Sequence, residues 1–189
     1  MNKIRYKITF HSYWHCGSGL SAGSDVDALV IKDKDGLPFI PGKTMKGLIR
    51  EAFEQYVTFI GKPCEDLIED NFGLPVEEGA RSKQGKAFFS NAIINEEERK
   101  VILSHHLEQY MYSAKASTSI DRDGVAASHT LRRFETVVPC TLIGEILEID
   151  EKIKPNLEKS LGMIKRIGVN RNRGLGRCTI SIINEGGNA

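Results

Sequence analysis

The hydrophobic residues of this chain follow two different periods. In residues 3–12, apolar side chains alternate with Lys and Arg, which is typical of a strand with one buried face. In residues 44–59 the apolar spacing is about 3.6 residues, which indicates an amphipathic helix. The whole chain, read in this way, predicts strands at 3–12 and 29–31, helices at 44–59 and 65–72, a strand at 87–95, a β-rich stretch at 134–150, a helix at 154–167 and a strand at 177–183.

The order of these elements indicates the fold class. Residues 96–133 are polar and weakly periodic, so we expect them to leave the core as an insertion in the form of a hairpin. The remaining order is β–α–β–β–α–β, which is the split βαβ pattern of ferredoxin-like domains. We therefore expect an α+β, ferredoxin-like fold in which residues 1–189 form one domain.

Composition excludes several classes of protein. Of the 189 residues, 40% are hydrophobic and 27% are charged, which argues against a disordered chain or a disulfide scaffold. No apolar run is long enough to span a membrane, and the N-terminal residues lack the apolar stretch of a signal peptide. We expect a cytoplasmic protein with no membrane partner. Its four scattered cysteines form no CxxC pair, so we expect reduced thiols and no structural zinc.

The charges are segregated, although the net charge is only +1. Residues 165–177 contain five basic residues and no acid, whereas residues 65–78 contain six acids and no base. Such a distribution can create a positive face for an anionic partner. Two solvated loops of opposite sign would give the same pattern.

The segment GKTMKGLIR, residues 42–50, is the first candidate binding motif. Gly42 permits a tight turn into the helix, whose first amides carry the positive end of the dipole. Lys43, Lys46 and Arg50 follow at helical spacing and share one face. A phosphate of a nucleic-acid backbone could be held there. The alternative is an ordinary helix start with solvated lysines.

The segment GVNRNRGLGR, residues 168–177, is the second candidate motif. Its glycines would let the backbone approach a ligand closely, and arginine guanidinium groups suit phosphate. The alternative is a basic surface connector. The candidate RNA-binding residues of this loop are Gly168, Gly174, Gly176, Arg171, Arg173 and Arg177.

Together the two motifs resemble the repeat-associated mysterious protein (RAMP) superfamily of CRISPR systems. Residues 37–47 (LPFIPGKTMKG) are similar to the family's LP-x-IPG-[ST]-[ST]-LKG helix start, and Gly168, Gly174 and Gly176 match its C-terminal glycine-rich loop. Within the superfamily the chain looks most like the backbone subunit that repeats along type III effector complexes. That resemblance rests on residues 71–73 (NFG), 118–127 and 134–139 (FETVVP).

The resemblance implies an RNA-recognition-like ferredoxin fold whose copies assemble along a guide RNA together with other CRISPR effector subunits. It also implies a thumb that extends into the duplex of guide RNA and complementary target RNA. In catalytic members an acidic residue in the loop before the LPxIPG motif supports metal-dependent cleavage of the target. Asp27 stands where that residue usually falls, Asp25 is its nearest rival, and Asp33 follows. A carboxylate at Asp27 could hold Mg²⁺, or it could cap the local loop.

Some residues depart from the pattern or allow two interpretations. Lys43 replaces a small hydroxyl residue, Arg166 stands where some relatives have a further glycine, and the thumb, roughly 101–133, is short. His15 could contact RNA or act as an acid or base. Trp14 could lie in the core or stack on a base. His105 and His106 fit a partly exposed helix.

Three functions follow from these observations. The first is a guide-RNA-binding backbone subunit that cleaves target RNA through Asp27. The second is a subunit of the same fold that binds guide RNA without cleaving. The third is a stand-alone endoribonuclease that processes guide RNA, as histidine-dependent relatives with two tandem ferredoxin-like domains do.

Overall fold

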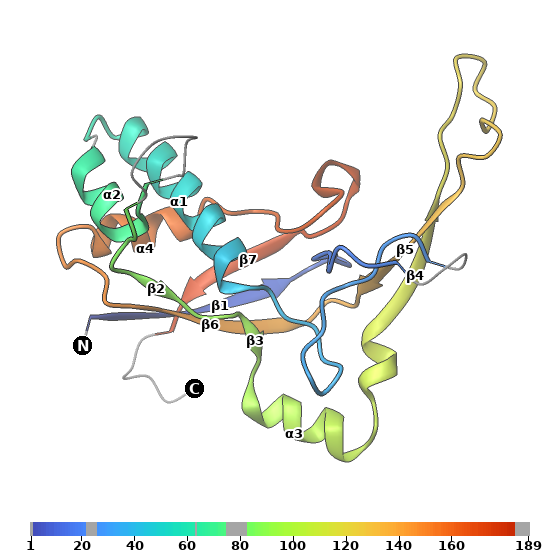
Figure 1. The fold of residues 1–189 in the computed structure, drawn as a ribbon, viewed down its shortest axis with the longest axis horizontal. Coiled ribbons are helices and arrows are strands. Elements are labelled where there is room, and N and C mark those ends of the chain that lie inside the picture. The colour runs from blue at the N-terminus through green and yellow to red at the C-terminus, as the bar shows by residue number, and fades with distance from the viewer. Residues whose placement is uncertain (1, 22–25, 63, 75–82, 184–189) are drawn as a thin grey trace.

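An antiparallel sheet forms the centre of the molecule (Figure 1). The computed structural model describes residues 2–21, 26–62, 64–74 and 83–183. The sheet contains β1 (Lys3–Phe10), β2 (Phe88–Phe89), β3 (Ile93–Ile94), β6 (Thr141–Leu147) and β7 (Cys178–Ile182). Its strand order is β2-β6-β1-β7, and β3 also pairs with β6. The core strands in chain order are β1, then the short β2 and β3, then β6 and β7. The first of them, β1, and the third, β6, are central, which is the ferredoxin-like arrangement. The expected α+β class is confirmed.

Three helices cover one face of this sheet (Figure 1). They are α1 (Gly42–Phe59), α2 (Glu65–Phe72) and α4 (Lys154–Leu161). The alternating pattern of β1 explains the packing, because Ile4, Tyr6, Ile8 and Phe10 are all buried and the residues between them are not. Within the described part of the chain, no helix has the length and apolar character needed to cross a membrane.

Trp14 belongs to the core. Its side chain is fully buried and its ring stacks on Phe10 with the centroids 4.5 Å apart. A ring in that position has no free face for a nucleobase. The base-stacking interpretation of Trp14 is therefore wrong.

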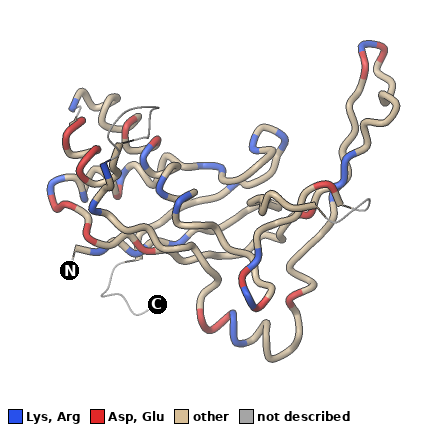
Figure 2. Tube along the Cα trace, in the orientation of Figure 1, with Lys and Arg blue, Asp and Glu red and all other residues tan. Residues whose placement is uncertain are grey.

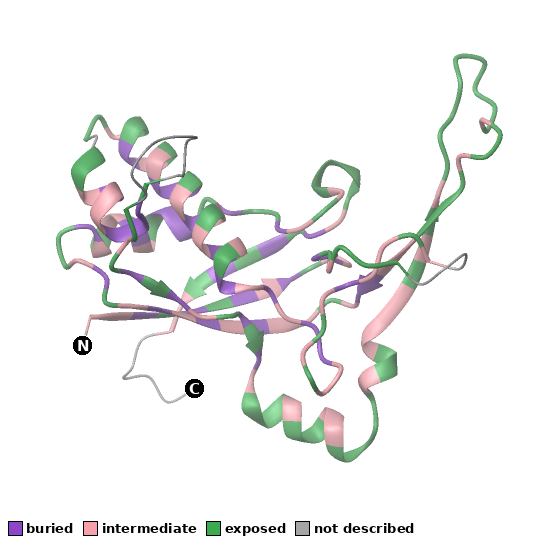
Figure 3. Ribbon diagram, in the orientation of Figure 1, coloured by how far each residue is buried: buried purple, intermediate pink, exposed green. Residues whose placement is uncertain are grey.

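The chain leaves the sheet after β3 and returns at β6. It forms α3 (Glu96–Ser104), a 3₁₀ turn (Glu108–Met111) and a hairpin of β4 (Tyr112–Ser117) and β5 (Arg132–Val137). Most residues in the far part of this hairpin are exposed (Figure 3). The expected hairpin is present, and the excursion extends four residues past the expected end at residue 133 because β5 belongs to it.

Four of the expected elements differ from the observed ones. Residues 29–31 form no strand, and only Val30 among them takes part in an isolated bridge, with Gly17. The expected strand at 87–95 is interrupted because Ala92 exchanges two backbone hydrogen bonds with Ile40 outside the sheet. The stretch 134–150 is divided between hairpin and sheet near Pro139, which has no N–H to donate. The last expected helix ends at Leu161.

Arg99 fastens α3 to the turn at residues 33–36. Its guanidinium lies 2.6 Å from a carboxylate oxygen of Asp33 and also pairs with Asp35. Burial would raise the pKa of Asp33, but the Arg99 hydrogen bond, the amides of Leu37 and Asp35 and the Arg99 charge together lower it. Asp33 therefore pairs with Arg99 of α3. This ion pair gives Asp33 a structural role, although it follows the catalytic candidates in the sequence.

The lowered pKa of Asp33 predicts an acid-sensitive contact. A depressed carboxyl pKa in the folded state stabilises the protein at neutral pH, and this contribution disappears as the pH falls through that pKa. We expect Arg99→Met to be less stable than the wild type at pH 7 and the difference to shrink below about pH 4. Urea unfolding of both proteins at each pH measures it. A difference that stays constant with pH would contradict the ion pair as its origin.

Candidate nucleic-acid interface

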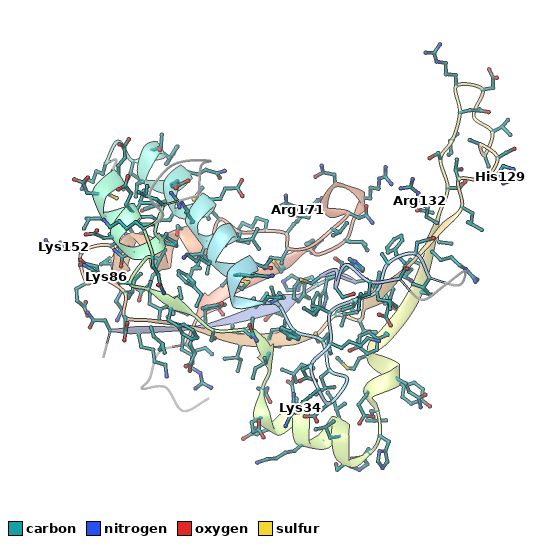
Figure 4. All side chains as sticks on the ribbon, viewed as in Figure 1. Lys34, Lys86, His129, Arg132, Lys152 and Arg171 are labelled. Atoms are coloured by element: carbon teal, nitrogen blue, oxygen red, sulfur yellow. The ribbon has the colours of Figure 1, made fainter. Side chains whose placement is uncertain are left out.

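A cavity of about 380 Å³ lies where three distant segments meet. The segments are the loop after β1, the base of the hairpin and the glycine-rich loop after α4. The hairpin and the glycine-rich loop rise on the same side of the sheet, with Arg132 on the former and Arg171 on the latter (Figure 4). We call this space the hairpin-base cavity. The residues that line it include His15, Asp27, Arg132, Arg133, Val169 and Arg173.

Asp27 is fixed against the hairpin. Its carboxylate oxygen Oδ2 accepts a hydrogen bond from the backbone N–H of Arg133 at 2.7 Å, and its own N–H donates to the Arg133 carbonyl at 2.8 Å. The residue is nevertheless exposed at the cavity wall. Among the described residues, the carboxylate thus binds an amide that is far away in the sequence. Asp25, the rival candidate, lies outside the described residues.

His15 joins the hairpin to the glycine-rich loop. Its ring nitrogen Nδ1 lies 2.6 Å from the Glu135 carbonyl, which can only accept, so this nitrogen carries the proton. Its backbone carbonyl accepts from the N–H of Val169 at 2.9 Å. Only 3% of the surface of His15 is exposed. His15 therefore lines the cavity as part of its rigid wall.

Two of the three candidate glycines serve contacts within the chain. A Cβ at Gly168 would lie 2.3 Å from the His15 carbonyl oxygen, and one at Gly176 would lie 1.9 Å from that of Ile167. Both glycines are thus needed for close packing against the protein's own backbone, and an RNA contact at these positions stays a prediction. Gly174, with a φ of +87°, has open space around it and ends the turn.

The arginines of the loop point in different directions because they form a 3₁₀ turn, Arg171–Arg173. Three residues per turn spread successive side chains around the axis. Arg173 lines the hairpin-base cavity, whereas Arg171 lines a second cavity beside α1. Arg177 is exposed and precedes β7, where its backbone N–H donates to the Ser12 hydroxyl.

The comparisons with known proteins identify the family. The model of the RAMP superfamily matches residues 7–179. The chain belongs to the RAMP superfamily. No curated protein matches it.

Solved structures share its fold at low sequence identity. A chain of "Cryo-EM structure of the Type III-B Cmr-beta bound to cognate target RNA" is 12% identical, with a TM-score of 0.71 over 96% of this chain and 97% of that one. A chain of "Type III-B Cmr-beta Cryo-EM structure of the Apo state" is 14% identical, with a TM-score of 0.69 over 97% and 98%.

The first candidate motif of this RAMP protein has largely structural roles. The amide of Gly42 donates to the Asn91 side chain at 2.8 Å, and a Cβ at this position would lie 2.0 Å from the Phe89 carbonyl oxygen. Arg50 pairs with Glu54 at 2.7 Å and donates to the Gly73 carbonyl at the end of α2. Gly42 therefore packs α1 against the sheet and Arg50 links α1 to α2. An RNA contact at Arg50 stays a prediction.

Helical periodicity separates the remaining two lysines of the motif from the glycine-rich loop. Lys46 lies one turn before Arg50, on the flank of α1 that faces α2, and Lys43 lies on the same side. The flank that contains Glu51 and Gln55 faces the loop instead. Helical spacing thus indicates that Lys46 and Arg173 face different sides of α1, which would divide the single cradle that the sequence predicts from them.

The structure brings other residues into the interface that sequence reasoning missed. Arg132 and Arg133 line the cavity. The only feature of the sequence that could have indicated them is that they form a basic pair at the end of the insertion. Glu135 accepts from the Val30 N–H at 3.0 Å and pairs with Lys32 at 2.8 Å, which holds the loop after Asp27 on β5. Glu135 stands in the FETVVP segment that carries part of the family resemblance.

The cations of the interface are exposed, and among the described residues none of them takes part in an ion pair. Lysines and arginines occur on the glycine-rich loop and at the hairpin base (Figure 2). Like charges held close together repel one another unless an anion lies between them. The set suited to a polyanion is Arg132, Arg133, Lys165, Arg166, Arg171, Arg173 and Arg177.

Carboxylates are sparse at the same place. Over the ranges that the structure describes, no group of three or more His, Cys, Asp or Glu side chains is arranged to hold a metal ion. Among the described residues that line the hairpin-base cavity, Asp27 is the one carboxylate. Mg²⁺ is commonly held by one or two carboxylates together with substrate phosphates, and Asp27 fits the protein part of such a site.

Proposed function

We propose that this RAMP protein is a CRISPR RNA-binding backbone subunit of a type III interference complex, which cleaves bound target RNA through Asp27. One observation supports this best, namely that the exposed carboxylate of Asp27 shares a cavity with Arg132, Arg133 and Arg173. The cations suit the RNA backbone, and the carboxylate suits a divalent metal at a phosphate. The fold shared with chains of type III-B Cmr-beta structures agrees with this role.

The residues of the chain divide the proposed work between them. The arginines bind phosphates of the guide and target strands without reading their sequence. Asp27 would contribute one oxygen ligand to Mg²⁺, and its hydrogen bonds to the Arg133 backbone hold the residue in place relative to the hairpin. The metal, when bound, would polarise the scissile phosphate and favour in-line attack by the adjacent 2′-hydroxyl.

A subunit that binds guide RNA without cleaving is the second candidate function. It is favoured by the engagement of Asp27 with a backbone amide, which gives the carboxylate a structural purpose. Incubating the assembled complex with guide-complementary RNA and Mg²⁺ separates the two functions. Metal-dependent cleavage supports the first, and an intact target supports the second. Cleavage of repeat RNA by the isolated protein without metal would instead indicate a guide-processing endoribonuclease.

The placement of the cations predicts unequal effects on RNA affinity. We expect Arg173→Ala to weaken binding of unrelated RNA sequences equally and to reduce the slope of log affinity against log salt by about one. Lys46→Ala, on the other flank of α1, is expected to have a smaller effect. Fluorescence anisotropy at several salt concentrations measures both. Equal losses from the two variants, or a loss that depends on sequence, would contradict this interface.

A further inference from the structure

A second cavity, of about 280 Å³, lies on the other side of the glycine-rich loop, between that loop and α1. We call it the α1 cavity. The same 3₁₀ turn borders both spaces, with Arg171 and Asn172 in the α1 cavity and Arg173 in the hairpin-base cavity. A strand bound along the turn would therefore pass from one cavity to the other.

Cations form one part of the lining. Lys165, Arg166 and Arg171 border the α1 cavity and are exposed. Arg166 also donates from Nη1 to the backbone carbonyl of Arg171, so its guanidinium is held across the loop. We call these three residues the cationic rim. The Arg166 guanidinium, held in this way, suits a phosphate because little side-chain entropy is lost on binding.

Apolar side chains form another part. Leu48 is half-buried, Met163 is 41% exposed and Ile164 is 8% exposed, and all three line the cavity. We call them the apolar floor. An exposed methionine beside three cations has no role in the core of the protein. A flat, apolar ring with an attached anion matches the combination of floor and rim.

Polar groups complete the lining. Glu51 and Gln55 lie one turn apart on α1, and the Gln55 amide donates to the Glu51 carboxylate at 3.4 Å. This carboxylate can accept a hydrogen bond from an amino or hydroxyl group of a nucleotide. Its charge would repel a phosphate, so the anionic end of a ligand belongs at the cationic rim.

We propose that the α1 cavity binds one unpaired nucleotide of the RNA strand that occupies the hairpin-base cavity. Its phosphate lies at the cationic rim and its base lies over the apolar floor. The site tolerates any base, because every base has a face that can pack on apolar side chains. This inference rests on the proposed function, since the neighbouring cavity must hold RNA.

RNA affinity tests the floor and the rim separately. With fluorescently labelled oligouridine and the full-length protein, we expect Met163→Ala to weaken binding about threefold to tenfold with an unchanged salt slope. We expect Arg171→Ala to weaken binding and to lower the slope by about one. Met163→Leu keeps an apolar floor and should bind like the wild type. Leu107→Ala and Lys152→Ala, an exposed apolar residue and an exposed lysine outside both cavities, are the matched controls.

The outcomes distinguish failure of this inference from failure of the proposed function. If Arg173→Ala weakens binding but Met163→Ala matches the wild type, the α1 cavity holds no nucleotide and the proposed function stands. If the wild-type protein binds no RNA, both are overturned. If Met163→Ala and Leu107→Ala weaken binding equally, the loss is unspecific and the nucleotide site is overturned.

Photocrosslinking gives an independent position for the base. Oligouridine that carries 4-thiouridine is expected to crosslink to the peptides that contain Leu48 or Met163. Crosslinks confined to the hairpin base and to the loop after β1 would overturn the α1 site while leaving RNA in the hairpin-base cavity.

Discussion

Asp27→Asn is expected to lower the rate of target-RNA cleavage by the assembled complex at least about a hundredfold, because the charge stabilisation that a metal supplies is worth several kcal/mol. Asparagine keeps an oxygen that can accept from the Arg133 amide, so the link between the loop and β5 is retained. What it loses is the negative charge that binds Mg²⁺. Single-turnover cleavage of guide-complementary RNA with saturating Mg²⁺ measures the change.

Two controls separate this loss from a structural effect. Asp123→Asn, at an exposed aspartate of the hairpin tip, should cleave at the wild-type rate. Assembly and guide-RNA affinity should be the same for Asp27→Asn and the wild type. Normal cleavage by Asp27→Asn would refute the assignment of the site. Failure of Asp27→Asn to assemble would show that the carboxylate acts on the fold, in which case the catalytic assignment is withdrawn.

Gly42→Ala and Gly47→Ala are expected to change stability in opposite directions, although both glycines lie in α1. A methyl group at Gly42 would meet the Phe89 carbonyl oxygen at 2.0 Å, so α1 must move away from the sheet. We expect a loss of about 3 kcal/mol in the free energy of unfolding, as for an overpacked core. Gly47 is exposed and has no atom within 4 Å of such a methyl. There alanine should stabilise the helix by about 0.5–1 kcal/mol.

Urea unfolding followed by far-UV circular dichroism measures both variants. Gly174→Ala is the intermediate case, because its φ of +87° is strained for alanine while the surrounding space is open. We expect its change in the free energy of unfolding to lie between those of Gly42→Ala and Gly47→Ala. A Gly42→Ala variant as stable as the wild type would mean that α1 can shift relative to the sheet without a loss of stability.

The proposed function depends on tertiary placement more than on the motifs that first indicated it. GKTMKGLIR led to the right family, yet Gly42 and Arg50 hold α1 in position. The contact of Gly42 with Phe89 joins residues far apart in the sequence. No local pattern in the helix distinguishes a glycine that packs on a strand from one that admits a phosphate.

The sequence by itself determined the α+β class, the order of the core elements, the presence of a hairpin insertion and membership of the RAMP superfamily. These properties follow from local periodicity and from motif spacing, which every segment carries in its own residues. The tertiary structure decided which charges share a cavity. Arg132, Arg133 and Asp27 meet Arg173 because the hairpin and the loop after α4 rise on the same side of the sheet. Lys46 is not among the residues that line this cavity, and the 3.6-residue period of α1 places it one turn before Arg50, which contacts the end of α2.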